Sequence, residues 1–375
     1  MQAKHGSLFL ARNHFQRLID VLVGEGYRCI GPTIKEGAIV YDLLDDVAQL
    51  PRGVRDHQSP GVYSLQVDAD PRWFSWANGP QALKPELFSP RTVMWRVVRD
   101  ETGLVFQPVQ PKQESTAVIG VRACDLAALK LQDRHFLEGS YSDPHYQARR
   151  EALFLVAVNC TSPAETCFCA STGDGPRATS GYDLVLSEVE EGFLIEAGSA
   201  RAEQILAALP TAPVTPAQEA VAAETIEQAA RSQTRVLDVD GIRKDIQTVL
   251  NDSIRDDSIW EDVSEHCLSC GNCTSVCPTC FCFSESDDGG LQLDESEHIR
   301  QWDSCFTQGH SYIHGLTVRS DTKQRYRQWI VHKLDTWHDQ YGSSGCVGCG
   351  RCISWCPVGI DITAVAKKIT AGKLS

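Results

Sequence analysis

The apolar positions of the first third of the chain change their spacing from helical to strand-like. From Leu8 to Val23 they recur at three- and four-residue intervals, which predicts a helix that stops at Gly24. Short apolar segments bounded by turn residues then predict strands near residues 29–32, 38–41 and 61–67. The lone Cys29 is expected to be a buried hydrophobic residue. The aromatic-rich stretch Asp70–Pro90 is expected to form a packed irregular loop.

Two continuous apolar runs follow, Ala117–Val121 and Leu153–Val158. Such runs are typical of strands that are buried on both faces of a sheet. A helical pattern begins directly after the first run. This alternation favours an α/β unit, in which the C-terminal ends of the strands collect ligand-binding groups. An antiparallel hairpin is expected between Gly181 and Ala197.

Between residues 200 and 235 the sequence becomes rich in Ala and Gln and is interrupted by three prolines. We interpret this change as a domain boundary, with an α/β domain at residues 1–235 and a second domain at residues 236–375. Helical spacing returns from Ile242 to Ile254. The expected fold class is therefore α+β: an N-terminal mixed α/β domain followed by a C-terminal, mainly helical domain.

Composition excludes several classes of function. A net charge of −14 disfavours nucleic acid as a partner, because phosphate binding needs a basic face. The chain has no glycine-rich nucleotide motif, so a flavin or nicotinamide would be carried by another subunit. Its longest apolar stretch, Ala152–Val158, is too short to span a membrane. Residues 1–6 show no secretory signal, and we expect a cytoplasmic protein whose sixteen cysteines are reduced.

The spacing C-x2-C-x2-C-x3-C-P occurs twice, at Cys267–Pro278 and at Cys346–Pro357. In the bacterial ferredoxin run, three such thiolates bind one 4Fe-4S cluster and the fourth reaches the other cluster. Gly271 and Gly350 allow the tight turns that such a loop needs. The spacing differs from the paired cysteines of zinc knuckles. The expected ligands are Cys267, Cys270, Cys273 and Cys356 for cluster 1, and Cys346, Cys349, Cys352 and Cys277 for cluster 2.

A third cysteine group belongs to the N-terminal domain. Cys124 and Cys160 each follow an apolar run, and Cys167 and Cys169 form a C-x-C nearby. One pocket at the strand ends could gather all four thiolates for a third 4Fe-4S cluster. A zinc site and unliganded buried thiols remain as alternatives.

The 68 residues from Pro278 to Gly345 are too many for the connection in a compact two-cluster ferredoxin and must fold. They contain Cys280, Cys282 and Cys305, which are one thiolate short of a cube. We therefore expect these three to pack unliganded beside cluster 1, with a three-cysteine site as the alternative. Lys333 and its neighbour His332 are interpreted as surface or supporting groups, although a cation near a cluster would raise the potential of that cluster.

Several of these segments together resemble a known family. The chain is similar to the iron-sulfur beta subunit of cytosolic sulfhydrogenases, which are group 3 nickel-iron hydrogenases, and to the A subunit of anaerobic sulfite reductases. The segment around Cys124 also resembles the cysteine segment of the beta subunit of deazaflavin-reducing hydrogenases. The segments that carry the resemblance are Gly120–Leu129, Val158–Thr161, Cys167–Cys169, Cys277–Cys282, Trp302–Cys305 and Cys346–Pro357.

The resemblance implies a helical dicluster ferredoxin domain and an electron-transfer subunit. Electrons would pass between a subunit that binds FAD and NAD(P) and a catalytic subunit, either a nickel-iron hydrogenase or a sulfite reductase. We find no nickel or sirohaem site in the sequence, so the chain is not expected to be catalytic alone. One rival interpretation is a heterodisulfide-reductase-like catalytic subunit that uses Cys280, Cys282 and Cys305. Another is a non-catalytic iron-sulfur scaffold or redox sensor.

Overall fold

The computed structural model describes residues 6–371, apart from positions 69, 82, 102, 112, 252 and 290–294. The expectation that the chain has no secretory signal rested partly on residues 1–5, which lie outside this range. The N-terminal half contains an eight-stranded sheet in the order β12-β1-β11-β10-β9-β8-β2-β3. Strands β10, β9, β8 and β2 run parallel, and the outer pairings are antiparallel. The strands are β1 (Leu8–Ala11), β2 (Arg28–Lys35), β3 (Ala38–Leu43), β8 (Thr116–Val121), β9 (Leu153–Val158), β10 (Leu184–Glu188), β11 (Gly192–Ala197) and β12 (Thr211–Pro213).

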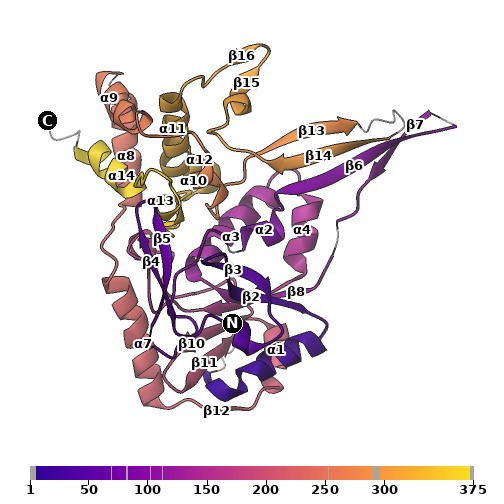
Figure 1. Ribbon diagram of the computed structural model, residues 1–375, viewed down its shortest axis with the longest axis vertical. Coiled ribbons are helices and arrows are strands. Elements are labelled where there is room, and N and C mark those ends of the chain that lie inside the picture. Colours follow the sequence, from indigo (N-terminus) through magenta and orange to yellow (C-terminus); the bar gives the residue numbers. More distant parts are fainter. Residues whose placement is uncertain are drawn as a thin grey trace.

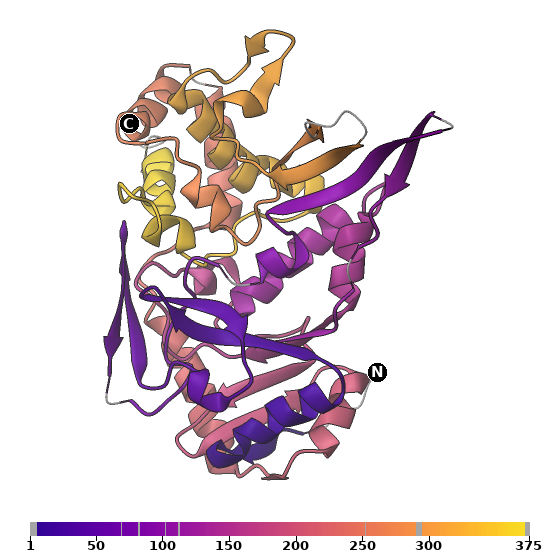
Figure 2. The same ribbon diagram turned by 45° about the vertical axis from the view of Figure 1, so that its right-hand side comes forward.

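Helices cover both faces of this sheet (Figures 1 and 2). Helices α1 (Phe15–Gly24) and α6 (Ala200–Ala207) contribute to the core on one face. Helices α3 (Ala123–Phe136) and α4 (Pro144–Glu151) contribute to the core on the other. Successive side chains of a strand point to opposite faces, so β8 and β9 supply both cores and all their residues are buried. This confirms the interpretation of the two apolar runs as doubly buried strands.

The first element differs from the sequence prediction. Residues Leu8–Ala11 form β1, which pairs with β11 on one side and with β12 on the other. A short 3-10 turn, η1 (Arg12–His14), leads into α1, which begins only at Phe15. The predicted helix start at Leu8 was therefore wrong, because two neighbouring strands satisfy the backbone of this segment.

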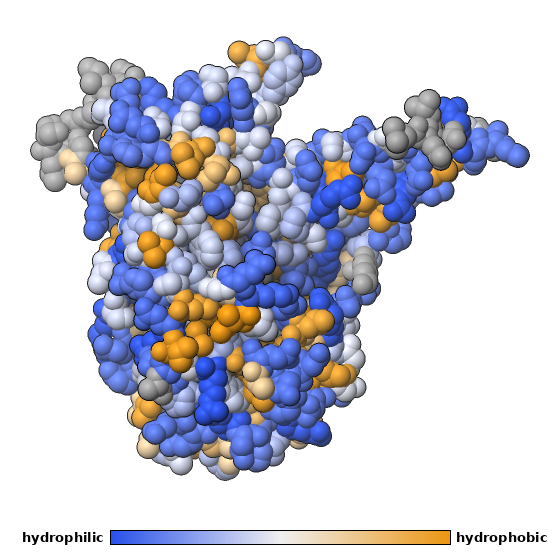
Figure 3. All heavy atoms as spheres, viewed as in Figure 1, coloured by the Kyte–Doolittle hydropathy of each residue, from blue (hydrophilic) through white to orange (hydrophobic). Residues whose placement is uncertain are grey.

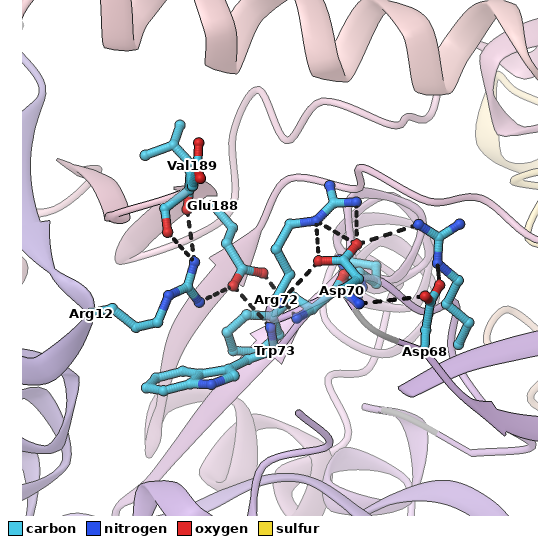
Figure 4. Close-up of polar contacts among 11 residues, drawn as sticks. Arg12, Asp68, Asp70, Arg72, Trp73, Glu188 and Val189 are labelled. Atoms are coloured by element: carbon cyan, nitrogen blue, oxygen red, sulfur yellow. Dashed lines mark hydrogen bonds and ion pairs between the residues drawn. The ribbon is translucent and has the colours of Figure 1, made fainter. Parts of the chain in front are cut away.

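The aromatic loop after Asp70 is packed onto the sheet, as predicted. The carboxylate of Glu188, on β10, accepts hydrogen bonds from the backbone N–H groups of Trp73 and Phe74, both at 2.9 Å. Arg12 forms an ion pair with Glu188 and donates to the carbonyl of Val189 at 2.8 Å (Figure 4). These contacts hold the loop against the first core, where Trp73 and Phe74 are buried.

The C-terminal half is mainly helical. Its longer helices surround a core that contains Trp260, Tyr326 and Trp329. They are α8 (Val239–Leu250), α9 (Ser253–Ser264), α11 (Thr322–Val331) and α14 (Ile362–Ala371). Helix α7 (Pro216–Arg231) occupies the segment predicted as the boundary. Shorter elements are η2 (Val47–Gln49), α2 (Lys84–Leu87), α5 (Cys169–Thr172), α10 (Asn272–Ser275), η3 (Gln308–Ser311), η4 (His332–Thr336), α12 (Trp337–Tyr341) and α13 (Arg351–Ser354).

A second sheet joins the two halves of the chain. Its order is β13-β14-β6-β7, from β6 (Arg91–Asp100), β7 (Gly103–Pro108), β13 (Phe283–Gly289) and β14 (Glu295–Trp302). Figure 1 shows it as the arm at the upper right. Two hairpins complete the fold: β4 (Val54–Ser59) with β5 (Val62–Val67), and β15 (Tyr312–Ile313) with β16 (Leu316–Thr317). Within the described part of the chain, no helix is long and apolar enough to cross a membrane.

Candidate iron-sulfur centres

The four cysteines predicted for cluster 1 line one cavity. Cys267, Cys270, Cys273 and Cys356 all face it, and Cys352 of the second motif contributes to the same wall. The first three lie in the first motif, around the start of α10, and Cys356 follows α13. The rest of the wall is largely apolar and aromatic, formed by Leu268, Phe306, Tyr326, Trp329, Pro357, Val358, Ile360 and Ile362, with Gly271 and Asn272. A thiolate-lined, largely apolar hollow suits the cubic cluster that the spacing predicts.

The backbone of both motif loops depends on glycine. Gly271 has a φ of 75° and Gly350 a φ of 71°, both in the left-handed region that favours this residue. Each forms the N-terminal cap of a short helix, α10 and α13 respectively. The sequence prediction of tight glycine turns in these loops is confirmed.

The cysteines predicted for cluster 2 also lie within electrostatic reach of one another. Burial raises the pKa of Cys346 to about 12 and that of Cys349 to about 11, and repulsion from Cys277 contributes to both. Burial likewise raises the pKa of Cys352, with further repulsion from Cys346, Cys349 and Cys277. Buried thiols of this kind hold their protons until a metal centre replaces them.

Lys333 is buried beside this group. Its ammonium group donates to Cys277 Sγ at 3.4 Å, to Thr279 Oγ1 at 2.9 Å and to the Gly345 carbonyl at 3.1 Å. Burial by itself would lower the pKa of Lys333, but the thiols of Cys277 and Cys280 raise it well above its ordinary value. The side chain is therefore a buried positive charge beside the cysteines predicted for cluster 2, and the alternative of a surface group is wrong for it.

The structure brings together the four cysteines predicted for the third cluster. Cys124 lies in the first turn of α3, directly after β8, and Cys160 follows β9. Because β8 and β9 are parallel neighbours, both residues lie at the same edge of the sheet. Burial raises the pKa of Cys169 to about 12, and repulsion from Cys160 adds to this. Cys167 repels Cys169 and Cys160, while Cys124 interacts electrostatically with Cys169.

The loop of this third group packs directly on the second motif. The N–H of Phe168 donates to the Gly348 carbonyl at 2.8 Å. A side chain at Gly348 would overlap the backbone of Cys169, and one at Gly350 would overlap that of Thr166. These glycines therefore allow close approach between the N-terminal and C-terminal halves, as well as a turn.

A buried ion pair spans the same contact. Arg351 on α13 donates to both carboxylate oxygens of Asp125, at 2.7 and 2.9 Å, and both side chains are almost fully buried. Asp125 follows Cys124, and Arg351 interacts electrostatically with Cys349. The pair therefore links the segment of Cys124 to the second cysteine motif.

The cysteine groups form a connected series. The third group interacts with cluster 2 through Cys349, which lies within electrostatic reach of both Cys124 and Cys169. The cysteines predicted for cluster 2 in turn lie within electrostatic reach of those predicted for cluster 1, since Cys273 contributes to the raised pKa of Cys352. Cys270 is exposed, unlike the other cysteines, so the series reaches the surface at the first cysteine motif. Cys29, outside the series, is buried in the first core, as predicted.

Three interacting residues had no assigned role in the sequence prediction. Arg351 and Asp125 both stand inside motifs that we had already singled out, next to cysteines. His310 lies against Cys282, and no spacing rule pointed to it. The sequence showed only that a carboxylate, Asp303, stands seven residues before His310.

Comparisons with known proteins agree with the geometry. Residues 266–360 match the family described as the 4Fe-4S dicluster domain. The chain is similar to the sulfhydrogenase 2 subunit beta of Pyrococcus furiosus, with 30% identity over 295 residues. The similarity covers 77% of this chain and 84% of that protein. No solved structure matches the chain.

Proposed function

The chain belongs to the family of sulfhydrogenase beta subunits, and from this we propose that it is the electron-relay subunit of a multi-subunit oxidoreductase. It would pass single electrons between a subunit that binds FAD and NAD(P) and a catalytic subunit, which we propose to be a nickel-iron hydrogenase. The dicluster domain and the hydrogenase relative support the general role of an electron-transfer subunit.

The connected series of cysteine groups carries this proposal. We assign Cys267, Cys270, Cys273 and Cys356 to cluster 1. Cys346, Cys349, Cys352 and Cys277 are assigned to cluster 2, and Cys124, Cys160, Cys167 and Cys169 to cluster 3. When bound, such clusters accept and donate one electron at a time, and their potential depends on burial and local charge. The electrostatic contacts between neighbouring cysteine groups support successive transfers along this series.

The remaining residues of the site position the ligands and set their charge. Lys333 offsets the negative charge of the thiolates at cluster 2. Arg351 offsets negative charge on the side that faces cluster 3, and its ion pair with Asp125 holds the guanidinium in place. The largely apolar wall of the first cavity limits the access of water to cluster 1. None of these residues provides a substrate-reducing group, which is consistent with a relay role.

Cluster 1 is the proposed exit to a partner. Leu268 is 64% exposed and Val358 41% exposed at the rim of its cavity, beside the exposed Cys270. Figure 3 shows an apolar area over the part of the molecule where α13 and α14 lie. Exposed apolar side chains at a redox centre suit a protein partner. We place the whole complex in the cytoplasm.

Co-purification tests this proposal. A tagged chain isolated anaerobically from its native source should bring with it a flavoprotein and a nickel-iron subunit. The intact complex should transfer electrons between hydrogen and a nicotinamide, and the chain alone should show no turnover. Cys273→Ser should reduce transfer at least about tenfold, because a hydroxyl is a poor ligand for these irons. Cys29→Ala, which changes a cysteine outside the series, is the matched control.

Other outcomes would overturn parts of the proposal. A sirohaem subunit in place of the nickel-iron subunit would move the chain to the sulfite reductase branch. Turnover of a disulfide substrate by the isolated chain would establish the heterodisulfide-reductase-like alternative. Purification without any partner would favour a scaffold or redox sensor.

A further inference from the structure

The hairpin of β15 and β16 exposes a group of large apolar side chains. Four of them are between 48% and 65% exposed: Tyr312, Ile313, Leu316 and Val318. Figures 1 and 2 show the hairpin at the upper end of the molecule, where it projects from the helices of the C-terminal half. Each strand has only two residues, so their pairing contributes little stability of its own. Exposed apolar residues that gather on a projecting tip typically mark an interaction site.

The base of the hairpin is fixed to the body of the protein. The N–H of Val318 donates to the Ser311 carbonyl at 3.0 Å, and the N–H of Arg319 donates to Ser311 Oγ at 3.0 Å. Ser311 is the last residue of η3 and is itself buried. These hydrogen bonds determine where the hairpin leaves the body, and its apolar side chains stay in contact with solvent.

The segments on both sides of the hairpin line the cavity of the first cysteine motif. Phe306 precedes the hairpin, and Tyr326 follows it on α11. Thr322 Oγ1 lies 2.9 Å from the hydroxyl oxygen of Ser269, which belongs to the first motif. Leu268, the neighbour of Ser269 in the sequence, is the most exposed apolar residue at the rim of this cavity. The hairpin is therefore anchored to the loop that carries this rim.

The charge pattern indicates which kind of surface can approach the hairpin. The chain has 49 Asp and Glu residues, but none lies in residues 266–284, 304–320 or 340–360. These ranges contain both cysteine motifs and the whole hairpin, with Arg319 at its base. An acidic partner is repelled by most of a chain with a net charge of −14, but not by this region. Apolar side chains without neighbouring carboxylates in the sequence favour a partner surface that has an apolar pocket and acidic residues at its rim.

We propose that the β15–β16 hairpin inserts into an apolar pocket with an acidic rim on the partner subunit that exchanges electrons with cluster 1. This inference rests on the proposed function, because it names the element that contacts the partner at the electron exit. In the complex Tyr312, Ile313 and Leu316 leave water, and Arg319 faces the carboxylates of the rim. The inserted hairpin positions the partner at the side of the molecule where Cys270 is exposed.

Counting partner subunits on the native complex tests the contact. Wild-type chain and an Ile313→Ser and Leu316→Ser double variant, both tagged, are isolated anaerobically from the native source, and the subunits that carry redox centres are counted per mole of chain. The double variant should retain at least about tenfold less of one such subunit, because apolar anchors dominate the stability of an interface. Its iron content should not change. Full retention of every subunit would overturn the proposal.

The matched control is the Val23→Ser and Val221→Ser double variant. It changes exposed apolar residues of α1 and α7, far from the hairpin in the sequence, and should retain every subunit. An equal loss in the control would overturn the proposal, because any exposed apolar pair would then have the same effect. A wild-type chain that forms a dimer of its own, and becomes a monomer in the hairpin variant, would identify a second copy as the occupant and also overturn it.

A charge variant tests the chemistry of the pocket. Arg319→Glu should lower the retained amount at least about tenfold, because it places a carboxylate against an acidic rim, whereas Arg319→Lys should retain the subunit. Unchanged retention in Arg319→Glu would overturn the acidic rim.

Failure of this contact and failure of the proposed relay give different results. If the hairpin variant keeps its partners and its hydrogen-dependent reduction of a nicotinamide, the hairpin proposal fails and the relay stands. If the wild-type complex transfers no electrons through the clusters but loses a subunit in the hairpin variant, the relay fails and the docking contact stands. A wild-type chain that binds no subunit would overturn both.

Discussion

Replacing Lys333 by methionine should lower the midpoint potential of cluster 2. The change removes a buried positive charge and keeps a side chain of similar length. In the wild type the ammonium group lies 3.4 Å from Cys277 Sγ. An added electron makes the cluster more negative, so a nearby cation stabilises the reduced state. Without the cation, reduction becomes less favourable.

The size of the effect follows from Coulomb's law. The added charge is spread over the cluster, so we take an effective separation of about 6 Å and an effective dielectric constant of about 20. The interaction is then about 3 kcal/mol, which corresponds to roughly 130 mV for a one-electron couple. Salt screens this interaction little, because the group is buried.

The measurement is an anaerobic redox titration of the full chain, followed by electron paramagnetic resonance. Lys368→Met is the matched control, since Lys368 is 58% exposed and forms an ion pair with Asp262 at the surface. It should shift no cluster by more than about 20 mV, because solvent screens exposed charges. Equal shifts in the two variants, or a higher potential in Lys333→Met with the iron content unchanged, would refute the reasoning.

Three further predictions concern the third cysteine group and its contact with the second motif. Asp125→Ala leaves Arg351 buried without its partner and should reduce the free energy of unfolding by about 3–5 kcal/mol. Asp262→Asn, in an exposed ion pair, should leave the denaturant midpoint nearly unchanged. Equal effects of the two variants would contradict the argument. Cys160→Ala in the full chain should remove about four irons and part of the charge-transfer absorbance; unchanged iron would leave cluster 3 unsupported. Gly350 has a positive φ, and in Gly350→Ala the new Cβ atom would overlap the backbone of Thr166, so the melting temperature should fall. An unchanged melting temperature would show that the loops of Thr166 and Gly350 can separate.

The sequence predicted the parts of the site that depend on local spacing. The two motifs placed eight cysteines, and the apolar runs of β8 and β9 placed Cys124 and Cys160 at one sheet edge, because parallel neighbouring strands end together. The strand at Leu8–Ala11 was missed, since its pairing with β11 and β12 depends on residues almost two hundred positions away. Helical spacing alone carried no information on that pairing.

Long-range contacts explain the other omissions. The burial of Lys333 results from the packing of η4 against the segment around Cys277, and no pattern in its own helix reports that. His310 reaches Cys282 only because β13 and β14 pair and η3 turns back over their ends. Both residues acquire their neighbours from tertiary structure.

The sheet shared by the two halves also constrains how the protein is made. Strand β6 pairs with β14, so Val98 must wait for Glu295, about 200 residues later in synthesis. At about 5–20 residues per second, the ribosome needs roughly 10–40 s to supply the missing partner. During that time the hairpin of β6 and β7 presents the open edge of β6 that later pairs with β14. Newly made chains are therefore vulnerable to aggregation before the last strands emerge, and a cell that produces this subunit has to protect that edge until synthesis is complete.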